Sequence, residues 1–249
     1  MGIVKMIDNF LTYQGPGSDH VGTYRHELKY VINCAEREDI KLRLNIALKK
    51  DPHAGKNGYM IRSLYFDDYW MSAYQEKSMG VLDRKKYRIR IYNYSDATIK
   101  LERKKKVDMY IYKEDARLSR QEFDMILAGQ YDFLLERPEN LCKEFYYECQ
   151  SRVLRPVTIV DYEREPYILD EGTVRVTFDN DVRTALGGYD IFDENLPCVN
   201  VLEAGTCVME VKYTGFLPQI VRSVIPPKAA ELKAVSKYVL CLEKTRSAL

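Results

Sequence analysis

Charged and apolar residues alternate along most segments of this chain that could form β-strands. Side chains two positions apart in a strand lie on the same face of a sheet. In the segment KKYRIRIYNY (85–94), for example, Lys86, Arg88 and Arg90 share one face and apolar residues take the other. This alternation predicts a sheet with one charged and one apolar face, which limits how the chain can bury its apolar side chains.

The charged face recurs in segment after segment and is mostly basic. Its further members are Arg25, Glu27 and Lys29; Lys100, Glu102, Lys104 and Lys106; Lys113, Asp115 and Arg117; Arg164; Arg175 and Asp179; and Glu210 and Lys212. The whole chain of 249 residues has 38 Lys and Arg against 37 Asp and Glu, a net charge of +1. The basic residues are therefore sorted onto one face without being in excess overall. For any single strand, an ordinary half-buried sheet with its charges toward water is the simpler explanation.

Several strands are predicted, and most are joined by short turns, so the sheet should be largely antiparallel. The predicted strands are residues 24–32, 59–66, 85–94, 98–106, 107–118, 157–167, 173–179, 199–203 and 207–213. Strands outnumber predicted helices, which indicates the α+β class. The Gly, Pro and Ser residues of QGPGSDH (14–20) predict a flexible N-terminal lead-in over residues 1–20, followed by a single domain over 21–249.

Amphipathic helices are predicted between the strands. In residues 35–50 the apolar stripe consists of Ile40, Leu42, Leu44, Ile46 and Leu48. Further helices are predicted at residues 70–77, 119–127, 138–151 and 228–244. Ser119 and Glu122 have the spacing of a capping box at the start of one of them. If these helices cover the apolar face of a curved sheet, the charged face must point inward.

An inward basic face restricts what such a protein can contain. Like charges that are packed together repel one another and lose hydration, so they need counter-charges, water or an anionic ligand. A linear phosphate chain meets this need, because Arg binds phosphate oxygens through paired N–H groups and Lys acts as a mobile point charge. The 20 tyrosines leave open a second interpretation, a basic surface on which nucleic-acid bases stack.

Composition argues against several other classes of protein. The balanced net charge is unlike that of a general nucleic-acid or membrane-surface protein. No apolar run approaches the roughly 18–20 residues of a membrane span, and the first twenty residues lack the features of a secretory signal. The six cysteines are scattered, as structural thiols in a reducing compartment are. We therefore expect a cytoplasmic protein.

At these same residues the chain resembles the polyphosphate polymerase domain of the vacuolar transporter chaperone (VTC) type, part of the triphosphate tunnel metalloenzyme, or CYTH-like, superfamily. The segments that carry the resemblance are YRHELKY (24–30), SLYFDD (63–68), KKYRIRIYN (85–93), IKLERKKK (99–106), the strand around Lys113, DYEREPY (161–167), VRVTFD (174–179), MEVKY (209–213) and KAVSKYV (233–239). They occur in the order expected for that domain. The resemblance implies an antiparallel eight-stranded β-barrel tunnel with helices packed outside.

The resemblance also implies an activity and a set of site residues. Polymerase members use a divalent metal, Mn²⁺ or Mg²⁺, and transfer the terminal phosphate of ATP or another nucleoside triphosphate onto an inorganic polyphosphate chain. The positions that match catalytic contacts are Arg88, Arg90, Lys104, Arg164 and Arg175. Those that match substrate-binding contacts are Lys29, Lys113, Lys212, Lys233 and Lys237. Glu210 matches the metal carboxylate, and Glu102 and Glu27 are further candidates that could equally neutralise adjacent bases.

One position departs from the family pattern. Triphosphatase and cyclase relatives open with Glu-x-Glu-x-Lys, whereas this chain has Arg25 at the first position. The loss of that carboxylate favours a polymerase, although a tripolyphosphatase and a non-catalytic polyphosphate-binding module need the same basic lining. We expect a nucleotide and inorganic polyphosphate or triphosphate as partners, and no nucleic acid. The membrane-anchoring and phosphate-sensing domains of the eukaryotic proteins have no counterpart here, so membrane attachment would need a separate membrane-protein partner.

Overall fold

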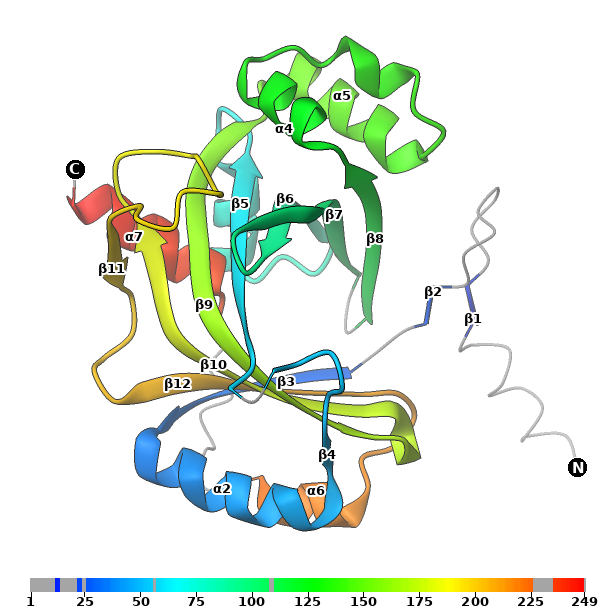
Figure 1. Ribbon diagram of the computed structural model, residues 1–249. Helices are drawn as coiled ribbons and strands as arrows, with labels where there is room; N and C mark the ends of the chain where they lie inside the picture. Colours follow the sequence, from blue (N-terminus) through cyan, green and yellow to red (C-terminus); the bar gives the residue numbers. More distant parts are fainter. Residues whose placement is uncertain are drawn as a thin grey trace, which may run out of the picture.

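A curved antiparallel sheet forms the centre of the computed structural model, which describes residues 12–13, 22–23, 26–55, 57–107, 110–225 and 235–248 (Figure 1). Eight strands follow one another in the hydrogen-bonded order β3-β12-β10-β9-β5-β6-β7-β8. Their bounds are β3 (His26–Asn33), β5 (Tyr59–Asp67), β6 (Arg84–Tyr92), β7 (Ser95–Val107), β8 (Tyr110–Leu118), β9 (Arg155–Leu169), β10 (Val174–Ala185) and β12 (Thr206–Tyr213). The short strands β4 (Lys49–Lys50) and β11 (Cys198–Asn200) pair with β9 and β10, and β1 (Thr12–Tyr13) pairs with β2 (Gly22–Thr23).

The sheet curls around a central space instead of lying flat (Figure 1). Strands β9 and β10, of 15 and 12 residues, lose their regular register between Asn180 and Arg183. Such an irregularity bends a strand and increases its twist. Among the described residues no ladder joins β3 to β8, so the barrel is open along that edge. The α+β prediction of an antiparallel, tunnel-like barrel is confirmed in this open form.

The helices lie at separate places around this barrel. They are α2 (Cys34–Ala47), α3 (Ser72–Ser78), α4 (Arg120–Leu127), α5 (Asn140–Arg152), α6 (Gln219–Val224) and α7 (Lys237–Ala248), with the 3₁₀ turns η1 (Asp132–Leu135) and η2 (Glu171–Thr173). The capping box at Ser119 is present, because its hydroxyl accepts from the N–H of Glu122 and the Glu122 carboxylate accepts from the N–H of Ser119. No helix within the described ranges is both long and apolar enough to cross a membrane.

Two groups of helices cover the outer, apolar face of the sheet. Figure 1 shows α2 and α6 together at one end of the barrel and α4 and α5 at the other. Phe145 of α5 is fully buried, in the same core cluster as Ile89 and Leu101 of the sheet. Leu44 of α2 belongs to a second core cluster with Val176 of β10. These sheet residues have the parity opposite to the charged ones. Because they are buried between the helices and the outer face of the sheet, the charged residues must lie on the inner face.

Helix α7, unlike α2, α4, α5 and α6, packs against the inner face. Its Tyr238 and Leu242 share a core cluster with Val160 and Tyr162 of β9, which have the same parity as Arg164. The hydroxyl of Thr245 contacts those of Thr158 and Thr184 at 3.3 and 2.9 Å. The helix therefore occupies part of the concave surface and leaves the rest of the charged face to line a cavity.

The predicted apolar stripe on residues 35–50 is wrong in part. Ile40, Leu44 and Leu48 are buried, but the side chains of Leu42 and Ile46 are 69% and 84% exposed. A step of two residues turns an α-helix by roughly 200°, so Leu42 and Ile46 lie on the opposite side from the buried residues.

Other boundaries also differ from the sequence predictions. Helix α6 has no counterpart among the predicted helices, and the predicted strand 199–203 is limited to β11. The predicted helix 228–244 begins at Lys237 and continues to Ala248, and residues 226–234 lie outside the described part. The predicted lead-in over residues 1–20 also lies outside it, apart from β1.

Candidate functional site

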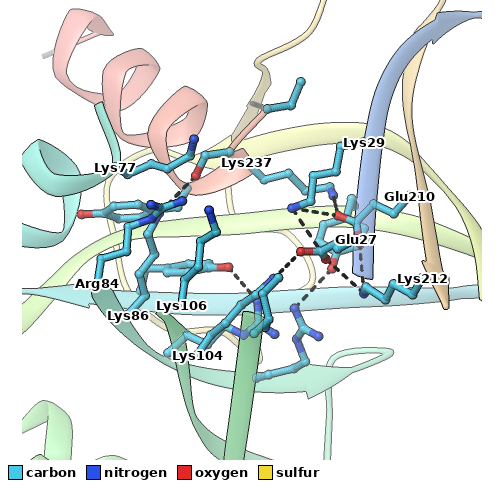
Figure 2. A pocket seen from close by; sticks show the side chains of 18 of the residues that line it. Glu27, Lys29, Lys77, Arg84, Lys86, Lys104, Lys106, Glu210, Lys212 and Lys237 are labelled. Carbon is cyan, nitrogen blue, oxygen red and sulfur yellow. Dashed lines mark hydrogen bonds and ion pairs between the residues drawn. The ribbon is translucent and has the colours of Figure 1, made fainter. Parts of the chain in front are cut away.

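A cavity of about 370 Å³ lies on the inner face of the barrel beside α7 (Figure 2). Of the described residues that line it, eleven are Lys or Arg and two are Glu. The basic residues are Lys29, Lys77, Arg84, Lys86, Arg88, Arg90, Lys104, Lys106, Arg164, Lys212 and Lys237, and the acidic ones are Glu27 and Glu210. The aromatic lining comes from Tyr65, Tyr162 and Tyr238.

The cross-strand register carries the charged rows around the curve of the sheet. Arg88 of β6 lies opposite Glu102 of β7, and Lys29 of β3 lies opposite Glu210 of β12. Residues directly opposite one another in an antiparallel pair project to the same face. The alternation in each strand therefore adds up to one continuous basic lining.

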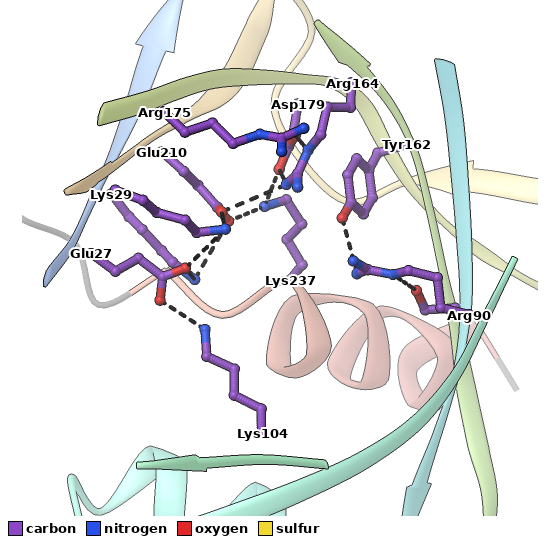
Figure 3. Close-up of polar contacts among 12 residues, drawn as sticks. Glu27, Lys29, Arg90, Lys104, Tyr162, Arg164, Arg175, Asp179, Glu210 and Lys237 are labelled. Carbon is purple, nitrogen blue, oxygen red and sulfur yellow. Dashed lines mark hydrogen bonds and ion pairs between the residues drawn. The ribbon is translucent and has the colours of Figure 1, made fainter. Parts of the chain in front are cut away.

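The carboxylate of Glu210 is the centre of an ion-pair network (Figure 3). It lies 2.7 Å from the ammonium of Lys237, 3.1 Å from Lys212, 3.5 Å from Lys29 and 3.6 Å from the Arg164 guanidinium. Burial alone would raise the pKa of Glu210, but Lys237 and the other cations hold this pKa well below its usual range. The carboxylate is therefore ionised and fully engaged with cations.

Asp179 fixes two of these cations from behind. Its buried carboxylate accepts two hydrogen bonds of 2.7 Å from the Arg164 guanidinium and lies 2.5 Å from the ammonium of Lys237. Burial opposes the charge on Lys237, but Asp179 and Glu210 raise the pKa of that ammonium. Lys237, the first residue of α7, thus ties the helix to the cavity wall.

Glu27 and Glu102 hold the remaining paired cations. Glu27 lies 2.7 Å from the Lys104 ammonium and 3.5 Å from that of Lys212. Glu102, only 1% exposed, lies 2.6 Å from the Arg88 guanidinium and 2.7 Å from the Lys113 ammonium. The cations hold the pKa of both carboxyls below the usual range, although burial acts in the opposite direction.

Arg90 is held by neutral groups instead. Its Nε donates to the Ser63 hydroxyl at 3.0 Å, and one terminal nitrogen donates to the Tyr162 hydroxyl at 3.2 Å. A guanidinium has five N–H donors, so these two bonds fix its orientation and leave donors for another acceptor.

The structure brings most of the predicted site residues together. Those that line the cavity are Lys29, Arg88, Arg90, Lys104, Arg164, Lys212, Lys237, Glu27 and Glu210. Glu102 lies behind Arg88, and Lys113 pairs with Glu102 and with Asp115 at 3.1 Å. Arg175 does not line the cavity, because it pairs with Asp51 at 2.8 Å. Lys233 lies outside the described residues. The roles assigned to all of these residues stay predictions.

Several lining residues were not among the predicted site residues. Lys86 and Lys106 have the right parity in β6 and β7, so the alternation already pointed to them. Lys77 comes from α3, and Arg84 is the first residue of β6. No strand pattern marks Lys77, because a helix brings it to the end of the sheet. Arg84 has the same parity as Lys86 and Arg88, but it lies one residue before the predicted strand 85–94. Asp179 was recognised only as a member of the charged face.

The carboxylates were tested as possible ligands of a divalent cation. Across the described ranges there is no group of three or more His, Cys, Asp or Glu side chains that could hold a metal ion. Glu27 and Glu210 both face the cavity and share contacts with Lys29 and Lys212. Mg²⁺ is usually bound by one or two carboxylates together with substrate phosphates and water. The residues therefore fit a hard cation that arrives with phosphate oxygens, and not one held by protein groups alone.

The fold is similar to several solved structures. A Hippeastrum protein described as a putative adenylyl cyclase with a dominant triphosphatase activity shares 13% identity over 90% of this chain and 95% of that chain, with a TM-score of 0.50. A Pyrococcus horikoshii protein shares 16% identity over 89% of this chain and 99% of that chain, with a TM-score of 0.44. A putative adenylate cyclase from Bacillus halodurans shares 13% identity over 85% of this chain and 92% of that chain, with a TM-score of 0.45. At such identities the Hippeastrum likeness supports the fold alone.

Sequence comparison is more specific. No curated protein matches the chain. The family model described as the VTC domain, however, matches residues 24–246, which is most of the chain and includes every strand of the barrel. The chain therefore belongs to the VTC domain family.

Proposed function

We propose that this domain transfers the terminal phosphate of ATP, or of another nucleoside triphosphate, onto an inorganic polyphosphate chain inside the cavity. The observation that carries the proposal is the lining itself, with eleven Lys or Arg side chains around about 370 Å³. Phosphoryl transfer needs in-line positioning and neutralisation of charge more than it needs protein nucleophiles. The nucleophile in this proposal is a phosphate oxygen of the acceptor chain itself.

The two arginines of β6 are suited to hold the donor triphosphate. Arg88 is fixed by Glu102 and by the Tyr65 hydroxyl at 2.7 Å, and Arg90 is fixed by Ser63 and Tyr162. Because these bonds set the planes of both guanidinium groups in advance, little reorganisation is needed when phosphate oxygens arrive. In the reaction, an oxygen of the acceptor's terminal phosphate attacks the γ-phosphorus, and the bond from that phosphorus to the β–γ bridging oxygen breaks. The products are a nucleoside diphosphate and a chain longer by one phosphate.

A divalent metal would act beside these arginines. Mn²⁺ or Mg²⁺ would be held by Glu210, with Glu27 as its neighbour, and would neutralise oxygens of the bound triphosphate. Lys29 and Lys212, which contact both carboxylates, would then be released to bind phosphate oxygens themselves. Lys237 and Arg164 would keep their positions, because Asp179 also holds them.

The test is product analysis with ATP labelled at the γ-phosphate, a divalent metal and a short polyphosphate primer. We expect labelled chains that lengthen with time, and we expect an Arg88→Ala/Arg90→Ala variant to make none. Lys105→Ala removes a β7 cation that lies one residue from Lys104 and therefore projects to the other face, so it should retain activity. Labelled orthophosphate without chain growth would indicate a tripolyphosphatase, and chain binding without turnover would indicate a binding module.

A further inference from the structure

The cations that line the cavity fall into two groups with different partners. Around Glu27 and Glu210, each ammonium or guanidinium has a carboxylate within ion-pair distance. Five other lining cations form no ion pair with any carboxylate of the described residues. One of them, Arg90, is held by the hydroxyls of Ser63 and Tyr162. We call the other four the unpaired cluster: Lys77, Arg84, Lys86 and Lys106. Figure 2 shows these four gathered on the side of the cavity away from Glu210.

The partners that the unpaired cluster does have are neutral. The Lys86 ammonium donates to the Ser236 hydroxyl at 3.2 Å and lies 4.5 Å from the centroid of the Tyr238 ring. The guanidinium of Arg84 donates to the carbonyl oxygen of Val81. These contacts orient the two side chains without neutralising them.

The register of β6 and β7 places these cations against one another. Arg84 lies directly opposite Lys106, and Lys86 lies directly opposite Lys104. Like charges directly opposite in an antiparallel pair destabilise a sheet. Burial and the surrounding cations, Lys29 and Lys77 first among them, lower the pKa of Lys86 well below its usual range. The chain thus maintains an unfavourable arrangement that an anion would relieve.

We propose that the unpaired cluster is a subsite for the metal-free part of an inorganic phosphate chain, while the metal-bearing triphosphate of the donor occupies the end of the cavity at Glu27 and Glu210. Carboxylates suit a phosphate group that brings a divalent cation, whereas a bare chain needs cations that have no carboxylate of their own. The assignment of the donor end rests on the proposed function. The cavity then has a direction, with the growing end of the chain toward Glu210 and the older phosphates toward α3.

Binding measured without metal or nucleotide tests the subsite directly. The probe is a long inorganic polyphosphate titrated in the presence of EDTA, compared with ATP titrated in the presence of Mg²⁺. For a Lys86→Met/Lys106→Met variant we expect chain binding to weaken by about tenfold or more, because two charge-assisted contacts to phosphate are lost. Binding of Mg²⁺–ATP should change by less than about twofold, since the paired end is intact.

Matched controls keep the result interpretable. Lys105→Met removes a cation one residue from Lys106 but on the opposite face, 3.9 Å from Asp83, and should leave chain binding unchanged. The midpoint of thermal unfolding of the double variant should be no lower than that of the wild type, because the variant removes repulsion. Lys77→Met, in helix α3, is a second variant that leaves the sheet untouched and should also weaken chain binding.

The proposal is overturned if the double variant loses Mg²⁺–ATP binding as strongly as chain binding, or if Lys105→Met has an equal effect. Its failure can be told apart from that of the proposed function. A wild-type protein that lengthens chains, with no loss in the cluster variants, would refute the subsite alone. A wild-type protein that binds chains through the cluster but makes none from ATP would refute the polymerase and leave the subsite standing.

Discussion

The titration of Lys104 gives the sharpest prediction, because its charge depends on pH near neutrality. Its ammonium contacts Glu27 at 2.7 Å, but burial and repulsion from Lys29 and Lys212 still lower the pKa of Lys104 to about 8. A bound phosphate chain adds negative charge beside this amine and raises its pKa again. Binding of the chain should therefore be coupled to proton uptake above pH 8.

The size of the effect follows from that pKa. About half of the Lys104 side chains are neutral at pH 8 and about nine-tenths at pH 9 in the free protein. If the chain binds only the form in which Lys104 is protonated, this group alone should lower the affinity about twofold at pH 8 and about elevenfold at pH 9, relative to the limit at low pH. Affinity falls as the pH rises, because the free protein loses the Lys104 proton and must take it up again before it can bind the chain.

The assay is titration with a long polyphosphate at pH 7, 8 and 9, at constant ionic strength and with EDTA present. A Lys104→Arg variant should show a shallower dependence, because a guanidinium does not lose its proton in this range. The remaining slope belongs to Lys86 and Lys77, whose pKa values are also lowered by burial and neighbouring cations, so a Lys86→Arg/Lys104→Arg variant should show a still shallower dependence. Equal affinity at pH 7 and 9, or an unchanged slope in the double variant, would refute the reasoning.

Two further predictions concern stability and are measured by urea unfolding. Glu102→Gln leaves the half-buried Arg88 and the adjacent Lys113 without their shared carboxylate, and should lower the free energy of unfolding by about 3 kcal/mol. Glu163→Gln, at an exposed position of β9, should change it by less than about 0.5 kcal/mol, and equal effects would contradict the ion-pair assignment. Phe145→Ala should cost about 3–5 kcal/mol, since this ring is fully buried against Phe66 and Tyr87. Tyr147→Ala on the same helix, 61% exposed, should cost much less, and a mild Phe145 variant would mean that α5 does not cover the sheet as described.

The inner face of the barrel could be predicted from sequence because the two-residue period of a strand is fixed by its backbone. That period placed Arg88, Arg90, Lys104 and Glu210 on one surface before any fold was known. The period could not predict how far along each strand a residue lies, and therefore whether its side chain reaches the cavity. Arg175 has the correct parity yet pairs with Asp51 outside the cavity, because its position depends on the register between β10 and its neighbours.

Other features depend on tertiary packing that no local pattern reveals. Lys77 reaches the cavity only because α3 folds back onto the end of the sheet. The position of α7 against the inner face was not predicted either. In the sequence, Tyr238, Cys241 and Leu242 form an ordinary apolar helix surface. Only the tertiary fold determines on which face of the sheet this surface packs.

The enclosure of eleven cations in a chain whose total charge is +1 has a consequence for the outer surface. The residues outside the cavity carry a net negative charge, so approaching polyanions are repelled until they come within a Debye length, roughly 8 Å at physiological ionic strength, of the basic lining. On the proposed function, we expect a wide polyanion such as a nucleic-acid duplex to stay on the exterior and to meet mainly that repulsion, whereas a single phosphate chain enters. Selection by width would then accompany selection by charge, and bulkier anions would compete poorly without any group that recognises them.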